Sequence, residues 1–157
     1  MALLTDVLVA SPSEAEAICR DARHFENWPC WEAKRFDNLI FADLLRALGA
    51  EADAVSLAGV DRLIYGDEDG PWIFHLPDVI PETLSTLEDD QILDLAGRWL
   101  QGENAGYDLF ERWLPGKKPS GFQEAVVGSV VVALKDLRTL SKQALAANTS
   151  LLLWMSL

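Results

Sequence analysis

The chain has 157 residues, a formal net charge of −12 at neutral pH, and a composition that is half hydrophobic with six tryptophans. These values predict one folded domain over residues 1–157, large enough to be stable without a disulfide or a structural metal. The negative charge argues against nucleic acid as a partner, because binding a polyanion depends on Lys and Arg at the phosphates. We expect no cofactor and no bound metal.

The sequence gives no sign of secretion or of a membrane segment. The N-terminus has no basic region before an apolar core, and Asp6 interrupts it, so no signal peptide is predicted. Cys19 and Cys30 are too few for a disulfide framework. The apolar run at residues 125–134 has ten residues, whereas a helix that spans a bilayer needs about 20. We therefore expect a cytoplasmic protein with no membrane role.

The beginning of the chain predicts a strand and then a short helix. Residues 4–9 form an apolar run typical of a strand. Ser11 marks a helix N-terminus, because its hydroxyl can accept from the first turn while Glu14, three residues later, reaches back to its amide. The helix that follows is expected to bury a stripe that includes Cys19.

Residues 24–34 have no clean period and contain a proline, so we expect a loop anchored by large aromatics, Trp28 and Trp31 among them. Such a loop either packs against the core or forms the wall of a binding site. The sequence returns to a helix over residues 36–48. The next ten residues are ambiguous, with a short strand over residues 54–58 as one interpretation.

The middle of the chain predicts a hairpin and an amphipathic helix. Two apolar runs, near 61–66 and 71–76, are joined by an acidic turn flanked by glycines. A helix follows over residues 88–100, and the acids in its first turn match the positive end of the helix dipole. A weaker helical pattern covers residues 103–114.

The last part of the chain predicts a long helix followed by a strand. Ser120 and Gln123 have the spacing of a capping box, and apolar residues recur every three or four positions over a helix near 121–147. Valines outside this stripe indicate that the first half of the helix is buried on several sides. Asn148 tolerates the left-handed conformation that ends many helices. The apolar run near 150–155 is typical of a strand covered on both faces.

The order of these elements predicts an α+β domain. We expect a small mixed sheet of about four strands, near 4–9, 61–66, 71–76 and 150–155, packed with about five helices that lie mainly on one face. The outline is similar to that of several small bacterial domains of unassigned function. This likeness is one of architecture and implies no role for any residue.

Two metal-binding patterns fit the sequence poorly. Cys19, His24 and Cys30 lie close together, but structural zinc takes four ligands, usually in closely spaced pairs. The acidic turn of the hairpin does not fit an EF-hand, because Tyr65 and Leu76 stand where acidic ligands belong. We therefore predict no metal site.

No pattern predicts catalysis. His75 has Asp61 as its expected neighbour across the hairpin, but no nucleophile motif accompanies them. We name no catalytic residue, and a non-catalytic role is favoured over an enzyme.

The acidic residues are concentrated between positions 51 and 94, where twelve acids accompany a single base, whereas the rest of the chain is nearly neutral. A surface of one charge sign steers association with an oppositely charged partner. Our leading hypothesis is an inhibitor- or immunity-like interaction protein that binds a basic protein partner. The alternative is that the acids form only a solvated face. The expected partner-binding residues are Asp67, Glu68, Asp69, Glu88, Asp89 and Asp90.

A second hypothesis is a small-molecule-binding protein or enzyme with a pocket walled by the aromatic loop. Tryptophan is enriched where binding energy is concentrated, although it also fills cores. The expected lining residues are Trp28, Trp31, His24 and His75.

Overall fold

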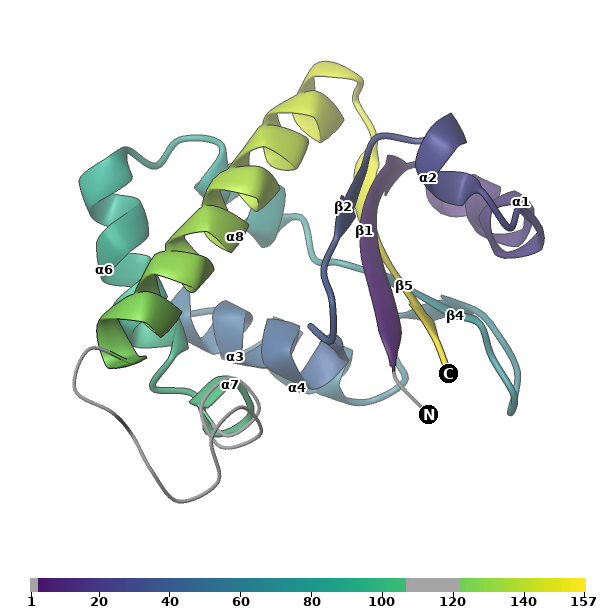
Figure 1. Cartoon of the computed structure of the whole chain (residues 1–157). Helices are drawn as coiled ribbons and strands as arrows, with labels where there is room; N and C mark the ends of the chain where they lie inside the picture. Colours follow the sequence, from purple (N-terminus) through teal and green to yellow (C-terminus); the bar gives the residue numbers. More distant parts are fainter. Residues whose placement is uncertain (1–2, 107–121) are drawn as a thin grey trace.

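A five-stranded sheet lies between two unequal layers of helices (Figure 1). The computed structural model describes residues 3–106 and 122–157. The α+β class expected from the sequence is confirmed, and so is the long C-terminal helix. No helix within the described ranges is both long and apolar enough to cross a membrane.

The strands follow the order β2-β1-β5-β4-β3, and each neighbouring pair is antiparallel. The central strand β5 (Ser150–Ser156) pairs along its whole length with β1 (Leu4–Ala10). On its other side β5 pairs with β4 (Trp72–His75), which forms the expected hairpin with β3 (Leu63–Tyr65). The short strand β2 (Cys30–Glu32) lies at the edge beyond β1.

This sheet corrects two details of the prediction. Residues 30–32 form a fifth strand although their segment lacks alternation, because pairing with β1 supplies their backbone hydrogen bonds. The sheet is antiparallel rather than mixed, because the chain enters β5 at the end where β4 finishes. His75 accordingly pairs with Leu152, and Trp72 pairs with Met155.

The larger helical layer covers the face of the sheet to which Val7, Val9, Leu151 and Leu153 point. It holds the main hydrophobic core, and α8 runs diagonally across it (Figure 1). The helices of this layer are α3 (Asn38–Ala47), α4 (Glu51–Ala58), α5 (Val79–Leu84), α6 (Asp89–Trp99), α7 (Glu103–Gly106) and α8 (Phe122–Ala146).

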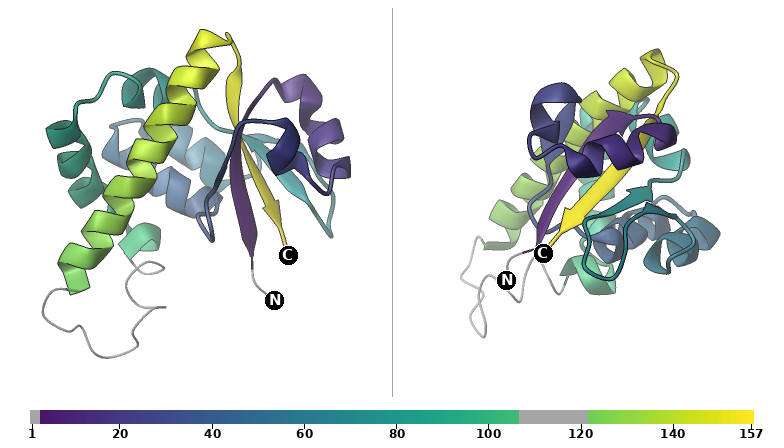
Figure 2. Two further views of the ribbon diagram at one scale, coloured as in Figure 1. Left: turned by 45° about the horizontal axis from the view of Figure 1, so that its top comes forward. Right: turned by 90° about the vertical axis from the view of Figure 1, so that its right-hand side faces the viewer.

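The smaller layer covers the opposite face, where Leu8, Ile73 and Leu152 form a second apolar cluster. Figure 2 shows its helices in front of β1 and β5 in the right-hand view. Alternate residues of β5 enter the two clusters, so this strand is covered on both faces as its composition predicted. The elements of this layer are the 3₁₀ turn η1 (Pro12–Glu14), α1 (Ala15–Arg20) and α2 (His24–Asn27).

Local sequence signals account for several boundaries. Ser11 and Glu14 form the expected capping box, and Asn148 ends α8 with a φ of 51°. The strand interpretation of residues 54–58 is wrong, because Ala54 and Leu57 are buried three positions apart on one face of α4.

The long helix α8 is less buried than expected in its first half. Val126 and Val130 are buried as predicted, but Val132 is 59% exposed, because it lines an open cavity rather than packing against another element. Ser120 and most of the helix expected over residues 103–114 lie outside the described residues.

Candidate functional site

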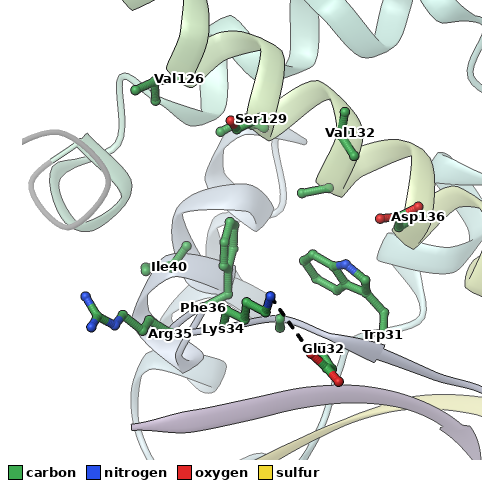
Figure 3. A pocket seen from close by; sticks show the side chains of 13 residues that line it. Trp31, Glu32, Lys34, Arg35, Phe36, Ile40, Val126, Ser129, Val132 and Asp136 are labelled. Atoms are coloured by element: carbon green, nitrogen blue, oxygen red, sulfur yellow. Dashed lines mark ion pairs between the residues drawn. The ribbon is translucent and has the colours of Figure 1, made fainter. Parts of the chain in front are cut away.

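A cavity of about 240 Å³ lies between the segment that follows β2 and one side of α8 (Figure 3). Trp31 and Phe36 form one wall, and Val126, Val130 and Ala133 of α8 form the facing wall. Most of the lining is therefore apolar and comes from two segments that are about ninety residues apart in sequence.

The aromatic wall rests on the main core. The Trp31 and Phe36 rings meet edge to face with centroids 5.6 Å apart, and the Phe36 ring lies 5.5 Å from that of Trp99. Trp99 is completely buried and donates its indole N–H to the carbonyl of Ile40 at 2.8 Å. Because buried partners hold these rings, the wall is preformed rather than assembled by a ligand.

The turn between Trp31 and Phe36 has an unusual backbone. Lys34 and Arg35 both have positive φ values, 41° and 79°, which costs side-chain-bearing residues on the order of 1 kcal/mol or more. Thr5 on β1 holds the turn, because its hydroxyl accepts from the Arg35 amide at 2.8 Å and its carbonyl accepts from the Ala33 amide at 2.9 Å. Strand β1 therefore fixes the shape of the cavity mouth.

Polar side chains surround this mouth. Glu32, Lys34, Arg35 and Asp136 are among its lining residues, and the Glu32 carboxylate points away from α8 (Figure 3). The Lys34 ammonium lies 4.0 Å from the Glu32 carboxylate, but both side chains are largely exposed. Such a pair contributes little free energy, so Lys34 can pair with another anion instead.

The four residues expected to line one pocket are not brought together. Trp31 packs with the main core and lines the cavity, whereas Trp28 packs with the second cluster and donates its indole N–H to Glu14 at 3.1 Å. The two tryptophans are three positions apart in an extended segment, so their side chains point to opposite faces of the sheet. His24 lies on the Trp28 face, where its ring packs against Trp154.

His75 does not have the surroundings of a catalytic base. Its Nε2 atom lies 3.2 Å from the hydroxyl of Ser150 and 3.7 Å from the carboxylate of Asp78, which replaces the expected Asp61. A serine–histidine–aspartate relay needs one ring nitrogen for each partner, whereas here one nitrogen faces both. Burial lowers the pKa of the His75 imidazole, against a smaller opposing effect of Asp78.

The expected partner-binding acids fall into two groups. Asp67, Glu68 and Asp69 are exposed at the tip of the β3–β4 hairpin, and the other three are exposed at the start of α6. Figure 1 and the left-hand view of Figure 2 show the hairpin and α6 at opposite ends of the molecule. Hydrogen bonds from Arg138 and Lys135 lower the pKa of Asp89, so basic side chains of α8 already neutralise part of the second group.

The cysteines and His24 form a different set from the one the sequence suggested. Cys19 packs with the second cluster, and burial raises the pKa of its thiol to about 11. Cys30 and His24 lie together with Asp6, whose carboxylate is 2.7 Å from His24 Nε2. The sequence does not identify Asp6 as a ligand, because the pairing of β1 with β2 that brings it there is not visible in the sequence.

Sequence reasoning also missed the contribution of α8 to the cavity. Its stripe residues Val126, Val130 and Ala133 were expected to be core, and they are buried, but one edge of that stripe faces the cavity. Trp28 and Trp31 are an odd number of positions apart, which in an extended segment places their side chains on opposite faces. This spacing could have shown that the two residues do not line one pocket.

No protein-family model, no curated protein and no solved structure matches the chain. A function can therefore be inferred only from the residues of this chain and their arrangement.

Proposed function

We propose that the protein binds a small molecule whose apolar part enters the cavity between Trp31 and α8. The observation that supports this proposal is a preformed, largely apolar cavity with a few polar side chains at its mouth. Ligand sites commonly combine these two features. The strained turn at Lys34 and Arg35 adds support, because such backbone conformations are concentrated at functional sites.

The dimensions of the cavity limit the ligand. An apolar cavity of about 150 Å³ accepts benzene. A volume of about 240 Å³ therefore suits one fused aromatic ring system or a branched aliphatic group. Lys34 at the mouth favours a ligand that carries a carboxylate beyond its apolar part.

Filling the cavity should weaken binding. Ala133 is buried in the wall, and its replacement by leucine places three more carbon atoms in the cavity, so we expect the affinity for an apolar ligand to fall at least about tenfold. Binding is measured by ligand-observed NMR with indole and with indole-3-acetate as its carboxylate counterpart. A Lys34→Met variant should weaken only the second ligand.

Ala125→Leu is the matched control, because Ala125 is an exposed residue of the same helix that does not line the cavity. Binding that is equal in wild type and Ala133→Leu would contradict the proposal. If wild type binds neither probe, the proposal is wrong and the cavity is only a gap in the packing between β2 and α8.

A second proposal, binding of a basic protein partner, is supported by the hairpin tip. Asp67, Glu68 and Asp69 are exposed, and none of them forms an ion pair with another described residue. Three adjacent uncompensated carboxylates attract cations from a distance of about one Debye length. The acids at the start of α6 support this proposal less, because Asp89 is paired within the chain.

Charge reversal tests the hairpin. Changing Asp67, Glu68 and Asp69 to lysine should remove from a native-lysate pull-down the basic proteins that wild type retains at low salt, because favourable steering becomes repulsion. The matched control reverses Glu16, Glu103 and Glu124, three exposed acids elsewhere, and has the same net charge. If the hairpin variant retains the same proteins as the control, the acids are a solvated face.

A further inference from the structure

Three side chains with metal-ligating atoms meet on the face of the sheet opposite the cavity. They are Asp6 of β1, His24 of α2 and Cys30 of β2. One carboxylate oxygen, one imidazole nitrogen and the thiol sulfur all lie within 4.8 Å of one another. His24 is buried, and the other two are half-buried, so the group lies at the boundary between the second core and solvent.

The fold fixes this group through strand register. Leu8 pairs with Cys30 and Asp6 pairs with Glu32, so Asp6, Cys30 and Glu32 point to the same face of the β1–β2 ladder. The short helix α2 then turns His24 over this face, where its ring lies 4.5 Å from that of Trp154. The three side chains therefore come from three different elements, and only the tertiary fold brings them together.

The imidazole of His24 is oriented as metal ligands usually are. Its Nδ1 atom lies 3.3 Å from the backbone carbonyl of Asp21, and its Nε2 atom faces Asp6 at 2.7 Å. A ligating histidine commonly donates its second N–H to a carbonyl or carboxylate, which leaves the other nitrogen for the metal. In this structure Nε2 is within hydrogen-bond distance of the Asp6 carboxylate. A bound metal would replace the proton on Nε2, while Nδ1–H donates to the Asp21 carbonyl.

The same geometry argues against a catalytic cysteine. Burial and the negative charges of Asp6 and Glu32 raise the pKa of the Cys30 thiol to about 12, whereas reactive cysteines have a lowered pKa. Nε2 also faces Asp6, so no separate nitrogen serves as a base for the thiol while the carboxylate orients the ring.

We propose that Asp6, His24 and Cys30 bind a divalent transition metal of the zinc type, with Glu32 or a water molecule as the fourth ligand. A set with one sulfur, one nitrogen and one oxygen suits zinc rather than magnesium or calcium, which prefer oxygen alone. Glu32 faces Asp6 across the ladder, and its side chain is 70% exposed and free to turn. A surface cavity of about 360 Å³, lined by Asp6, His24 and Glu32, gives access from solvent.

The experiment uses tag-free full-length protein that has been reduced and freed of metal. Zinc binding is measured by isothermal titration calorimetry, and cobalt(II) serves as an absorption probe, because a cobalt–thiolate bond gives a charge-transfer band in the near ultraviolet. We expect one metal per chain and a cobalt–thiolate band. Cys30→Ser should weaken zinc binding about 100-fold and remove the band, and His24→Gln should also weaken binding.

Cys19→Ser is the matched control, and it keeps the test decisive even if Cys30→Ser does not fold. The chain has only two cysteines, so a cobalt–thiolate band in the Cys19→Ser variant can come only from Cys30. Absence of the band in that variant, or zinc binding unaffected by both His24→Gln and Cys30→Ser, would overturn the proposal. Asp6 and His24 would then be a structural hydrogen-bonded pair beside the half-buried Cys30 thiol.

Discussion

Replacing Trp99 with alanine is expected to lower the free energy of unfolding by about 3–5 kcal/mol. The side chain is completely buried in the main core, and its ring contacts those of Phe36 and Phe41. Alanine would leave a large void and deprive the Ile40 carbonyl of its indole donor at 2.8 Å. Chemical unfolding followed by circular dichroism measures the loss.

Trp99→Phe separates the two contributions. Phenylalanine fills most of the space but cannot donate to Ile40, so we expect a smaller loss of about 1–3 kcal/mol. The surface substitution Leu93→Ala on the same helix, at an exposed position, should change the free energy by no more than about 0.5 kcal/mol. A Trp99→Ala loss as small as that of Leu93→Ala would mean that α6 does not anchor this core.

Trp99 also links the core to the cavity. Its ring supports Phe36, which in turn meets Trp31 at the cavity wall. A Trp99→Phe protein that remains folded should therefore bind an apolar ligand more weakly than wild type, although residue 99 is not part of the lining. This effect would be indirect, because Trp99 supports Phe36 and Phe36 supports Trp31, whereas Trp99 does not line the cavity.

The elements with strong local signals could be predicted from the sequence. The amphipathic pattern of α6 predicts which face of the helix is buried. The continuous apolar run of β5 predicts a strand that is covered on both faces. Likewise, the capping residue Ser11 and the helix-ending Asn148 act through their own backbone neighbours. These signals do not depend on what the rest of the chain does.

The elements that depend on tertiary partners could not be predicted. β2 forms because β1 provides its backbone hydrogen-bonding partners, and the cavity lies between α8 and the turn that follows β2. Similarly, Asp6 and Cys30 are 24 positions apart and meet only through strand register. A sequence pattern carries no information on register when the strand has three residues and its turn contains two positive φ values.

The Asp43 carboxylate is the other site where a single change should have a large effect. Its side chain is only 2% exposed, and it accepts from the backbone amides of Asn104 and Ala105 at 2.7 and 2.8 Å. Arg46 donates to its second oxygen at 2.9 Å. A carboxylate of α3 therefore satisfies the free amides at the start of α7, where the chain leaves α6.

Asp43→Ala should lower the free energy of unfolding by about 3–5 kcal/mol, because it leaves two amides without their acceptor and leaves Arg46 with Glu51 as its one remaining acidic partner among the described residues. Asp43→Asn keeps the shape but loses the charge and presents an NH₂ group toward other donors, so we expect about 1.5–3 kcal/mol. Asp53→Asn is the matched control, since Asp53 pairs with Arg62 at 2.7 Å but is 37% exposed. Its loss should stay below about 1 kcal/mol.

Hydrogen exchange locates the effect of Asp43→Asn within the fold. The amides of Asn104 and Ala105 should exchange faster in this variant, whereas those of the central strand β5 should change only by the global loss of stability. Equal losses for Asp43→Asn and Asp53→Asn would show that burial does not strengthen this carboxylate's bonds. Gly102 offers an independent check, because a Cβ atom there would lie 2.6 Å from the Asp43 side chain, so Gly102→Ala should weaken the same contact.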